Sequence, residues 1–314
     1  MNDIATRRAR GNEIAHLHKI WDESFDFRDR DLFFSYWFNP DFCIVAEHEN
    51  TITAMGYLLP VGNLIINGEP PIPCAMIYAV AAHPEHRNRG FGTAVTAGLI
   101  KLARTIGYPA VVLRPSEDSL FTFYCQHTEM REWFFADELC LAAPQGCLTQ
   151  VSLKHAPPEE YMHLRESLLT EYPHIQLTAP ALQYQRRLCG IYGGNLFRFE
   201  TPAGIGCAVI ERQSYEIVCV KELLLSERCR PGKPQSAMIM PDTRASLPHS
   251  VISSIAAAFP AEKYVLKLPV RHGNVPGSQQ DTTSKRHAML TLPQELISVH
   301  AAITPSPWYG LAFD

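Results

Sequence analysis

The sequence contains no apolar run long enough to cross a bilayer. Its longest apolar stretches, residues 64–66 and 255–259, fall far short of the ~20 residues that a membrane-spanning helix needs. Charge of one sign is also scarce, because 28 basic residues face 32 acidic ones and the formal net charge is −4. No basic field therefore favours nucleic acid or an anionic membrane as a partner. No apolar segment follows the basic residues near the N-terminus, so we expect a cytoplasmic protein without a secretory signal.

Cysteine pairs of the C-x-x-C type are missing as well. The nine cysteines are odd in number and dispersed, which in a cytoplasmic protein indicates reduced and mostly buried thiols. Hydrophobic residues make up 46% of the chain and charged residues 19%, a composition that can fill more than one core. At roughly 100–200 residues per domain, the 314 residues predict two domains. An oligomeric state is possible, and the sequence does not decide it.

The first half of the chain opens with helices and then alternates strands with helices. Apolar spacing predicts helices over residues 14–25 and 32–38, strands over 43–46, 52–60, 75–82 and 110–113, and helices over 93–107 and 116–126. The strands at 43–46 and 52–60 are separated by a short polar turn, which predicts an antiparallel pair. This order indicates an α/β unit that covers residues 1–145.

The second half repeats this order in a weaker form. Helices are expected over residues 157–169, 181–188 and 250–259, and strands over 195–200, 206–211, 216–225 and 264–268. A second α/β unit is therefore predicted over residues 146–314. Residues 271–286 are polar and carry Gly and Pro, which predicts a mobile loop. Residues 308–314 are apolar and aromatic, so we expect the end of the chain to dock against the fold.

The most informative segment is a buried strand that runs through Pro84 into a glycine-bearing loop and a helix. The loop reads Arg87-Asn88-Arg89-Gly90-Phe91-Gly92. A helix N-terminus offers free backbone N–H groups, glycines let the backbone approach phosphate oxygens closely, and guanidinium groups match phosphate geometry. The segment therefore predicts an anion site. It lacks the Gly-Lys-Ser/Thr of a P-loop, and Val95 stands where a dinucleotide fingerprint needs a third small residue.

This strand, loop and helix resemble the acetyl-CoA motif of the Gcn5-related N-acetyltransferase (GNAT) family. The resemblance continues through a strand ending at residues 113–115 to a helix with Tyr124, where the family places the tyrosine that protonates departing coenzyme A. The sequence departs from the family after Tyr124, because residues 125–130 replace the usual Gly-Phe pair. With its second half, the chain is similar to the tandem acetyltransferases of the Eis type, in a short form without their third domain. The strand at 216–225 leads into residues 226–234 without a Gly-x-Gly spacing, so the second unit is expected to be degenerate.

The resemblance implies a fold class and a site. The fold is α/β, with two tandem GNAT-like domains whose mixed sheets are flanked by helices, residues 1–145 being the catalytic domain and 146–314 the degenerate one. Acetyl-CoA is the implied co-substrate, without a metal, and an amine of a small molecule or a peptide is the implied acceptor. Tyr124 is the implied catalytic residue, and the implied cofactor-binding residues are Ala79, Val80, Ala81, Arg87, Asn88, Arg89, Gly90, Phe91, Gly92 and Thr93.

Several alternatives stay open at this point. The chain could be a non-catalytic acyl-CoA-binding or regulatory protein, or a scaffold without any affinity for CoA. Tyr124 could be a core aromatic, and Glu47 is either a base that acts through water or a surface acid at a strand end. Residues 83–86, His-Pro-Glu-His, could suggest a metal site, but a solvated loop is the preferred interpretation. Nine thiols need no catalytic role, because an amine attacks a thioester directly.

Overall fold

The computed structural model describes residues 4–144, 151–201, 204–226, 249–269, 282–293, 307–311 and 313. Its strands are β1 (Thr6–Arg8), β2 (Cys43–His48), β3 (Thr51–Ile65), β4 (Ile72–Ala82), β5 (Ala110–Leu113), β6 (Arg131–Ala142), β7 (Lys154–His155), β8 (His174–Leu177), β9 (Asn195–Thr201), β10 (Gly204–Arg212), β11 (Ile217–Leu225), β12 (Lys263–Pro269) and β13 (Thr282–Thr291). Its helices are α1 (Ile14–Asp22), α2 (Phe27–Tyr36), α3 (Phe91–Thr105), α4 (Asp118–His127), α5 (Pro158–Leu168), α6 (Ala179–Ile191) and α8 (His249–Ala258), with 3-10 turns at Gly11–Glu13, Pro40–Phe42 and Pro84–His86.

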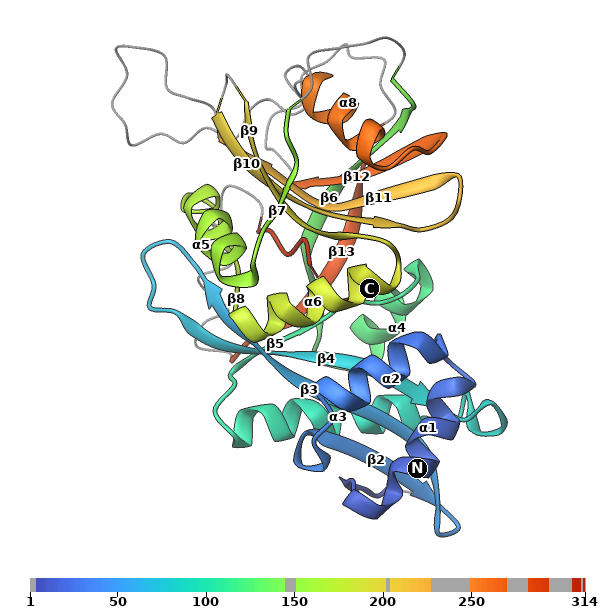
Figure 1. Ribbon diagram of the computed structural model, residues 1–314. Helices are drawn as coiled ribbons and strands as arrows, with labels where there is room; N and C mark the ends of the chain where they lie inside the picture. Colours follow the sequence, from blue (N-terminus) through green and yellow to red (C-terminus); the bar gives the residue numbers. More distant parts are fainter. Residues whose placement is uncertain are drawn as a thin grey trace.

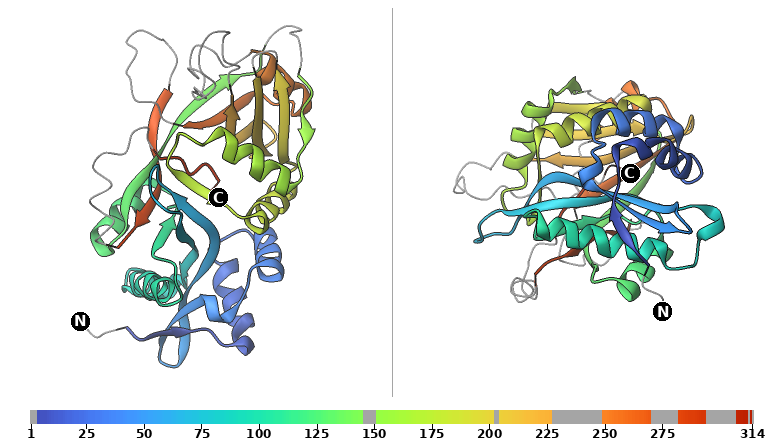
Figure 2. Two further views of the ribbon diagram at one scale, coloured as in Figure 1. Left: turned by 90° about the vertical axis from the view of Figure 1, so that its left-hand side faces the viewer. Right: turned by 90° about the horizontal axis from the view of Figure 1, so that it is seen from below.

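All thirteen strands belong to one mixed sheet that runs through both halves of the molecule (Figure 1). The strand order is β1-β2-β3-β4-β5-β13-β6-β12-β11-β10-β9-β7, and β8 pairs with β3 beside this path. Helices cover both faces of the sheet: α3 and α4 pack on one face of the N-terminal half, and α1, α2 and α6 lie over the other (Figure 2). The predicted α/β class with a mixed, helix-flanked sheet is confirmed.

The N-terminal half matches the expected order of elements closely. β2, β3 and β4 are antiparallel neighbours, and β4 pairs with β5 in parallel across α3, as a strand-helix-strand unit requires. Two details differ from the sequence prediction. β1 is an additional short strand beside β2, and β3 is one strand of 15 residues where a shorter one was expected.

The C-terminal half also contains the predicted strands. β9, β10 and β11 form consecutive antiparallel pairs, and β12 adds to β11 in parallel. The segment 227–234, on which the prediction of a degenerate second unit depends, lies outside the described residues. Across the described helices, none has both the length and the hydropathy that crossing a membrane requires.

The predicted loop at residues 271–286 is wrong at its end, because residues 282–286 belong to β13. This strand inserts between β5 and β6, and it pairs antiparallel with both. Its polar side chains are satisfied across the ladder: Lys285 Nζ lies 2.7 Å from a Glu138 oxygen, and Arg286 Nη1 lies 3.0 Å from a Glu132 oxygen. These cross-strand ion pairs stabilise a strand in a segment whose composition alone indicates a loop. Residues 270–281 lie outside the described part of the chain.

The largest hydrophobic core joins the two halves. It contains Trp21 and Tyr57 from the first half together with Tyr161, Tyr184 and Trp308 from the second. A separate cluster lies under α3 and α4, and a third packs α8 on the sheet of the C-terminal half. The boundary between residues 145 and 146 stays a prediction, but the halves share both their sheet and their main core.

The end of the chain docks as expected where it is described. Trp308, Tyr309, Leu311 and Phe313 are all buried. The indole nitrogen of Trp308 donates a hydrogen bond of 2.8 Å to the buried carboxylate of Glu222 on β11. Because that carboxylate has no contact with water, this bond fixes the last segment to the sheet. The final residue, 314, lies outside the described residues.

Candidate active site

The predicted cofactor strand, β4, separates from its neighbour β5 halfway along its length. Backbone pairing between them covers residues 74–77 of β4 and 110–113 of β5, where β5 ends. On its other side, β4 remains paired with β3 as far as Ala82. Within the described sheet, residues 78–82 therefore have a strand neighbour on one edge only. Their free edge can accept an extended, amide-bearing ligand as an additional strand.

A β-bulge lies at the point where the two strands separate. Tyr57 of β3 faces Tyr78, and Met55 faces Ala81, so that one residue, Gly56, stands opposite two. Ala79, in the bulge, has a positive φ of 48°. A bulge redirects side chains and strengthens local twist. As a result, Tyr78 and Ala79 both contact the main core, whereas Val80 contacts the cluster under α3 and α4.

The glycine-bearing loop forms the expected start of α3. Gly90 is the N-cap residue of α3, and its φ of 87° lies in the left-handed region. Residues with a side chain rarely adopt this conformation, whereas glycine adopts it without strain. No side chain caps this helix end, so its first backbone N–H groups stay available to an anion. A Cβ placed on Gly92 would meet no atom within 4 Å, which shows open space over the first turn. This geometry fits the pyrophosphate of CoA.

The two arginines of the loop are exposed and already oriented. The Arg87 side chain donates hydrogen bonds to the carbonyl oxygens of Ala82 (3.3 Å) and Glu23 (3.4 Å). Arg89 contacts ring nitrogens of His86 at 3.1 Å and of His48 at 3.0 Å. Both guanidinium groups therefore lie beside the helix start as positive charge, where they can add to the helix dipole.

Tyr124 lies on α4, buried against α3. Burial raises the pKa of its phenol to about 12, and an interaction with the Thr96 side chain acts in the opposite direction. Thr96 in turn donates a hydrogen bond of 2.9 Å to the carbonyl oxygen of Gly92. The phenol thus stays protonated at neutral pH and is linked through Thr96 to the loop helix. Sequence reasoning missed Thr96, although its position four residues after Gly92 places it one helical turn above the loop.

Glu47, the weaker candidate for a base, is engaged elsewhere. Its carboxylate forms a close ion pair with Arg7, which also contacts Glu13. The hydrogen bond from Arg7 lowers the pKa of Glu47. A carboxylate with a lowered pKa accepts a proton less readily, so this arrangement favours a structural role at the strand end.

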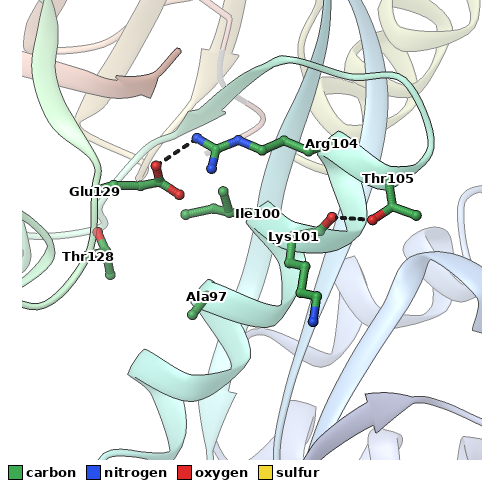
Figure 3. A pocket seen from close by; sticks show the side chains of 7 residues that line it. All are labelled: Ala97, Ile100, Lys101, Arg104, Thr105, Thr128 and Glu129. Atoms are coloured by element: carbon green, nitrogen blue, oxygen red, sulfur yellow. Dashed lines mark hydrogen bonds and ion pairs between the residues drawn. The ribbon is translucent and has the colours of Figure 1, made fainter. Parts of the chain in front are cut away.

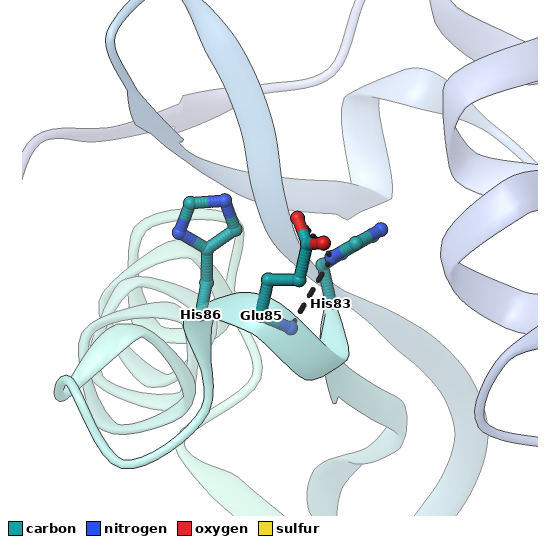
Figure 4. A group of neighbouring side chains, drawn as sticks. All are labelled: His83, Glu85 and His86. Carbon is teal, nitrogen blue, oxygen red and sulfur yellow. Dashed lines mark hydrogen bonds and ion pairs between the residues drawn. The ribbon is translucent and has the colours of Figure 1, made fainter.

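Residues 83–86 form a compact group beside the loop (Figure 4). Ligand atoms of His83, Glu85 and His86 lie within 4.8 Å of one another. His83 Nε2 is 3.1 Å from a carboxylate oxygen of Glu23, and His86 faces the guanidinium of Arg89. The positive charge of Arg89 opposes a second cation at this place. The absence of a metal site stays a prediction.

A pocket of about 330 Å³ lies on the outer side of α3 (Figure 3). It is lined by Ala97, Ile100, Lys101, Arg104, Thr105, Thr128 and Glu129. Arg104 forms an ion pair of 2.6 Å with Glu129 across it. The pocket contains none of the predicted site residues, and it follows the C-terminal half of the helix, away from the loop. We therefore place the candidate site at the separation of β4 from β5.

Comparison with known proteins concerns the family of the N-terminal half and the fold of the chain. Residues 5–126 match the family model described as an acetyltransferase (GNAT) domain. The N-terminal unit of the chain is a GNAT domain. No curated protein matches the sequence.

Solved structures share the fold over nearly the whole chain. A GCN5-related N-acetyltransferase from Anabaena variabilis is 17% identical with a TM-score of 0.61, covering 91% of this chain and 72% of that one. A GCN5-related N-acetyltransferase from Kribbella flavida is 15% identical with a TM-score of 0.60, covering 92% and 71%. Eis1 from Mycobacterium abscessus is 10% identical with a TM-score of 0.55, covering 94% and 75%. At these identities the likeness shows the fold alone, and it extends over both halves of the chain.

Proposed function

We propose that the protein is an N-acyltransferase that moves an acetyl group from acetyl-CoA to a primary amine. The observation that carries this proposal is a single arrangement: a bulged strand with a free edge leads directly into an uncapped helix start with a glycine in the left-handed region. This arrangement offers an amide-pairing edge and a phosphate cradle in the order in which CoA carries its amides and its pyrophosphate. The GNAT fold supports acyl transfer in general.

Each predicted cofactor residue has a role in this proposal. Residues 79–81 pair through their backbone with the pantetheine amides, and the backbone N–H groups of residues 90–93 bind the pyrophosphate. Arg87, Asn88 and Arg89 add charge and shape to the rim of this cradle. Asn88 has a φ of 59°, so the loop turns sharply just before the helix. Because these contacts are made largely by the backbone, side-chain identity matters less here than conformation.

The chemistry needs one proton donor and one proton acceptor. The amine nitrogen attacks the thioester carbon, the carbon–sulfur bond breaks, one proton leaves the nitrogen for water, and one proton reaches the sulfur. Tyr124 supplies the proton to the sulfur, since its phenol is neutral at neutral pH, and the phenolate that remains takes a proton back from water before the next turnover. The strand β4 and the loop at residues 87–92 hold the thioester in place for attack, and this positioning supplies the rest of the rate acceleration.

Calorimetry of CoA binding tests the cradle. Replacing Gly90 by Val places a β-branched side chain at a φ of 87°, and it should weaken CoA binding about tenfold or more, equivalent to ~1.4 kcal/mol. Gly68→Val is the matched control, because Gly68 has a φ of 84° in a turn away from the loop. We expect this control to carry the same backbone strain and to bind CoA like the wild type. Equal affinity of the folded Gly90 variant and the wild type would overturn the assignment.

A further inference from the structure

The buried face of α3 carries one hydroxyl among apolar side chains. The other buried residues of this helix are Phe91, Val95, Leu99, Ile100, Leu102 and Ala103. Thr96 is as fully buried as they are, with an exposed fraction of 0%. Valine has nearly the same shape without a polar atom, so packing alone does not explain a threonine here. A buried hydroxyl needs hydrogen-bond partners, and the partners of Thr96 indicate its role.

The Thr96 hydroxyl has a partner on each side. It donates a hydrogen bond of 2.9 Å to the carbonyl oxygen of Gly92, one helical turn earlier. A hydroxyl has one proton and two lone pairs, so its oxygen can take part in a second hydrogen bond. The second partner is the phenol of Tyr124: burial raises the pKa of this phenol, and the hydrogen bond with Thr96 acts in the opposite direction. Thr96 thus lies between the phosphate loop and Tyr124.

The packing around Tyr124 agrees with this contact. Val95 and Leu99, which share the buried face of α3 with Thr96, belong to the same hydrophobic cluster as Tyr124. The end of α4 is fixed as well, because Thr128 donates two hydrogen bonds to the carbonyl oxygen of Tyr124, from its backbone nitrogen at 2.9 Å and from its hydroxyl at 2.7 Å. Both ends of the Thr96–Tyr124 contact are therefore held by rigid elements.

Proton transfer from Tyr124 to sulfur has an energetic cost that such a contact reduces. A phenol with a pKa of about 12 is a weaker acid than a thiol such as that of cysteine, whose ordinary pKa is about 8.5. The transfer therefore leaves a phenolate that is a stronger base than the thiolate it protonates, and its apolar surroundings disfavour its charge. A hydrogen-bond donor that stabilises the phenolate as it forms keeps the proton on the sulfur.

We propose that Thr96 is a positioning residue for acyl transfer, whose hydroxyl stabilises the phenolate that Tyr124 becomes when it protonates the sulfur. This inference rests on the function proposed above. In this step the O–H bond of Tyr124 breaks, an S–H bond forms, and the negative charge passes from the sulfur to the phenol oxygen. The Thr96 hydroxyl turns its proton from the Gly92 carbonyl oxygen toward that phenolate. Water then returns a proton to Tyr124, and the hydroxyl turns back.

Thr96→Val tests the hydroxyl in steady-state kinetics with acetyl-CoA and a panel of primary amines. We expect kcat to fall about tenfold or more, the effect of losing a hydrogen bond to a charged group. The Kd for CoA should stay at its wild-type value and the melting temperature should not fall, since valine suits the apolar face. Thr96→Ser keeps the hydroxyl and should restore kcat.

Thr105→Val is the matched control. The Thr105 hydroxyl makes the same kind of hydrogen bond on the same helix, 2.8 Å to the carbonyl oxygen of Lys101, and it lies one helical turn from the end of α3 that is farther from the loop. Its loss should leave kcat unchanged. A wild-type kcat in Thr96→Val, or an equal loss of kcat in Thr105→Val, would overturn the inference.

A double variant separates this role from a structural one. If Thr96 acts through Tyr124, adding Thr96→Val to Tyr124→Phe should lower kcat no further, because the phenol oxygen is already gone. If Thr96 only supports α3, the two losses multiply, and that result would overturn the inference. If Tyr124→Phe slows turnover and Thr96→Val does not, the inference alone fails. If Tyr124→Phe keeps the wild-type kcat, the proposed proton donor is wrong, and the inference fails with it.

Discussion

Tyr124 combines a buried phenol with a position beside the loop helix, and burial decides its protonation. Its pKa is raised to about 12, so the group is a donor and not a base throughout the neutral range. The Thr96 side chain connects it to the carbonyl oxygen of Gly92, and thus to the first turn of α3. The proposed proton donor to sulfur therefore contacts, through Thr96, the helix α3 whose first turn binds the phosphates in our proposal.

Removing the hydroxyl of Tyr124 should affect turnover and not binding. We expect Tyr124→Phe to lower kcat by about 10²-fold or more, because general acid catalysis acts only in the transition state. Its Kd for CoA should be that of the wild type. Steady-state kinetics together with calorimetry check both values, with Tyr215→Phe as the exposed control. An unchanged kcat would mean that water or another group protonates the thiolate.

The raised pKa also predicts a pH dependence. A phenol with a native pKa of about 12 keeps its proton where an ordinary tyrosine, with a value of 10.0, begins to lose it. The native state therefore binds more protons than the unfolded state between these two values, and its stability falls only as pH rises through that window. Below it, kcat should show no loss from Tyr124. A kcat profile that falls with an apparent pKa near 9 in the wild type, and not in Tyr124→Phe, would contradict this environment.

At the residue scale, the site could be predicted where it depends on local conformation. Gly90 at a helix start is visible in the sequence because it follows a buried strand and precedes an apolar helical pattern. Tyr124, on the helix after β5, is singled out by the family resemblance, and its catalytic role stays a prediction. The partnership of Tyr78 with Tyr184 could not be predicted, because these residues are 106 positions apart and meet only in the folded core. Aromatic residues at helical spacing indicate burial, but they do not indicate against which strand.

Among the elements, the packing of α3 on the bulge of β3 and β4 depends on one small residue. A Cβ on Gly56 would lie 2.8 Å from Leu99 Cδ1 and 2.9 Å from Val95 Cγ1. Gly56→Ala should therefore reduce the free energy of unfolding by ~1–3 kcal/mol through overpacking. It should also weaken CoA binding, because α3 and the bulge shift together. Denaturant unfolding and calorimetry measure the two effects.

Gly11→Ala is the matched control for this prediction. Its Cβ would meet nothing within 4 Å, so the free energy of unfolding should change by no more than ~0.5 kcal/mol. Equal stability of the Gly56 and Gly11 variants would show that α3 has room to move away from the sheet.

The element that sequence reasoning could not place is β13. Its polar residues indicate a loop when read alone. In the fold they pair with β6, where Lys285 and Arg286 form diagonal cross-strand ion pairs with Glu138 and Glu132. Long-range pairing of this kind is not encoded in local periodicity. The result matters for the site, since β13 lies next to β5 and so supports the strand from which β4 separates.

At the scale of the whole molecule, the end of the chain is bound to a buried ionic group. Glu222 accepts hydrogen bonds from Trp308, from Tyr161 at 2.9 Å and from Arg165 at 3.0 Å. Trp308→Phe removes one donor from a carboxylate that water does not reach, and should cost ~1–3 kcal/mol of stability. Trp37→Phe is the control, because the indole nitrogen of Trp37 has no partner among the described residues and its loss should cost less. Similar losses in thermal unfolding would contradict the role of the Trp308 hydrogen bond.

The central claim concerns acyl transfer, and a single reaction tests it most directly. The purified protein is incubated with acetyl-CoA and a panel of primary amines, one in each sample, and the released thiol and the acetylated amine are quantified in the same sample. Transfer by direct attack predicts one acetylated amine for each thiol released, with both amounts falling together in Tyr124→Phe. Thiol release without acetylated amine would show hydrolysis. CoA binding without thiol release from any amine would show a binding protein, and either result would contradict the account.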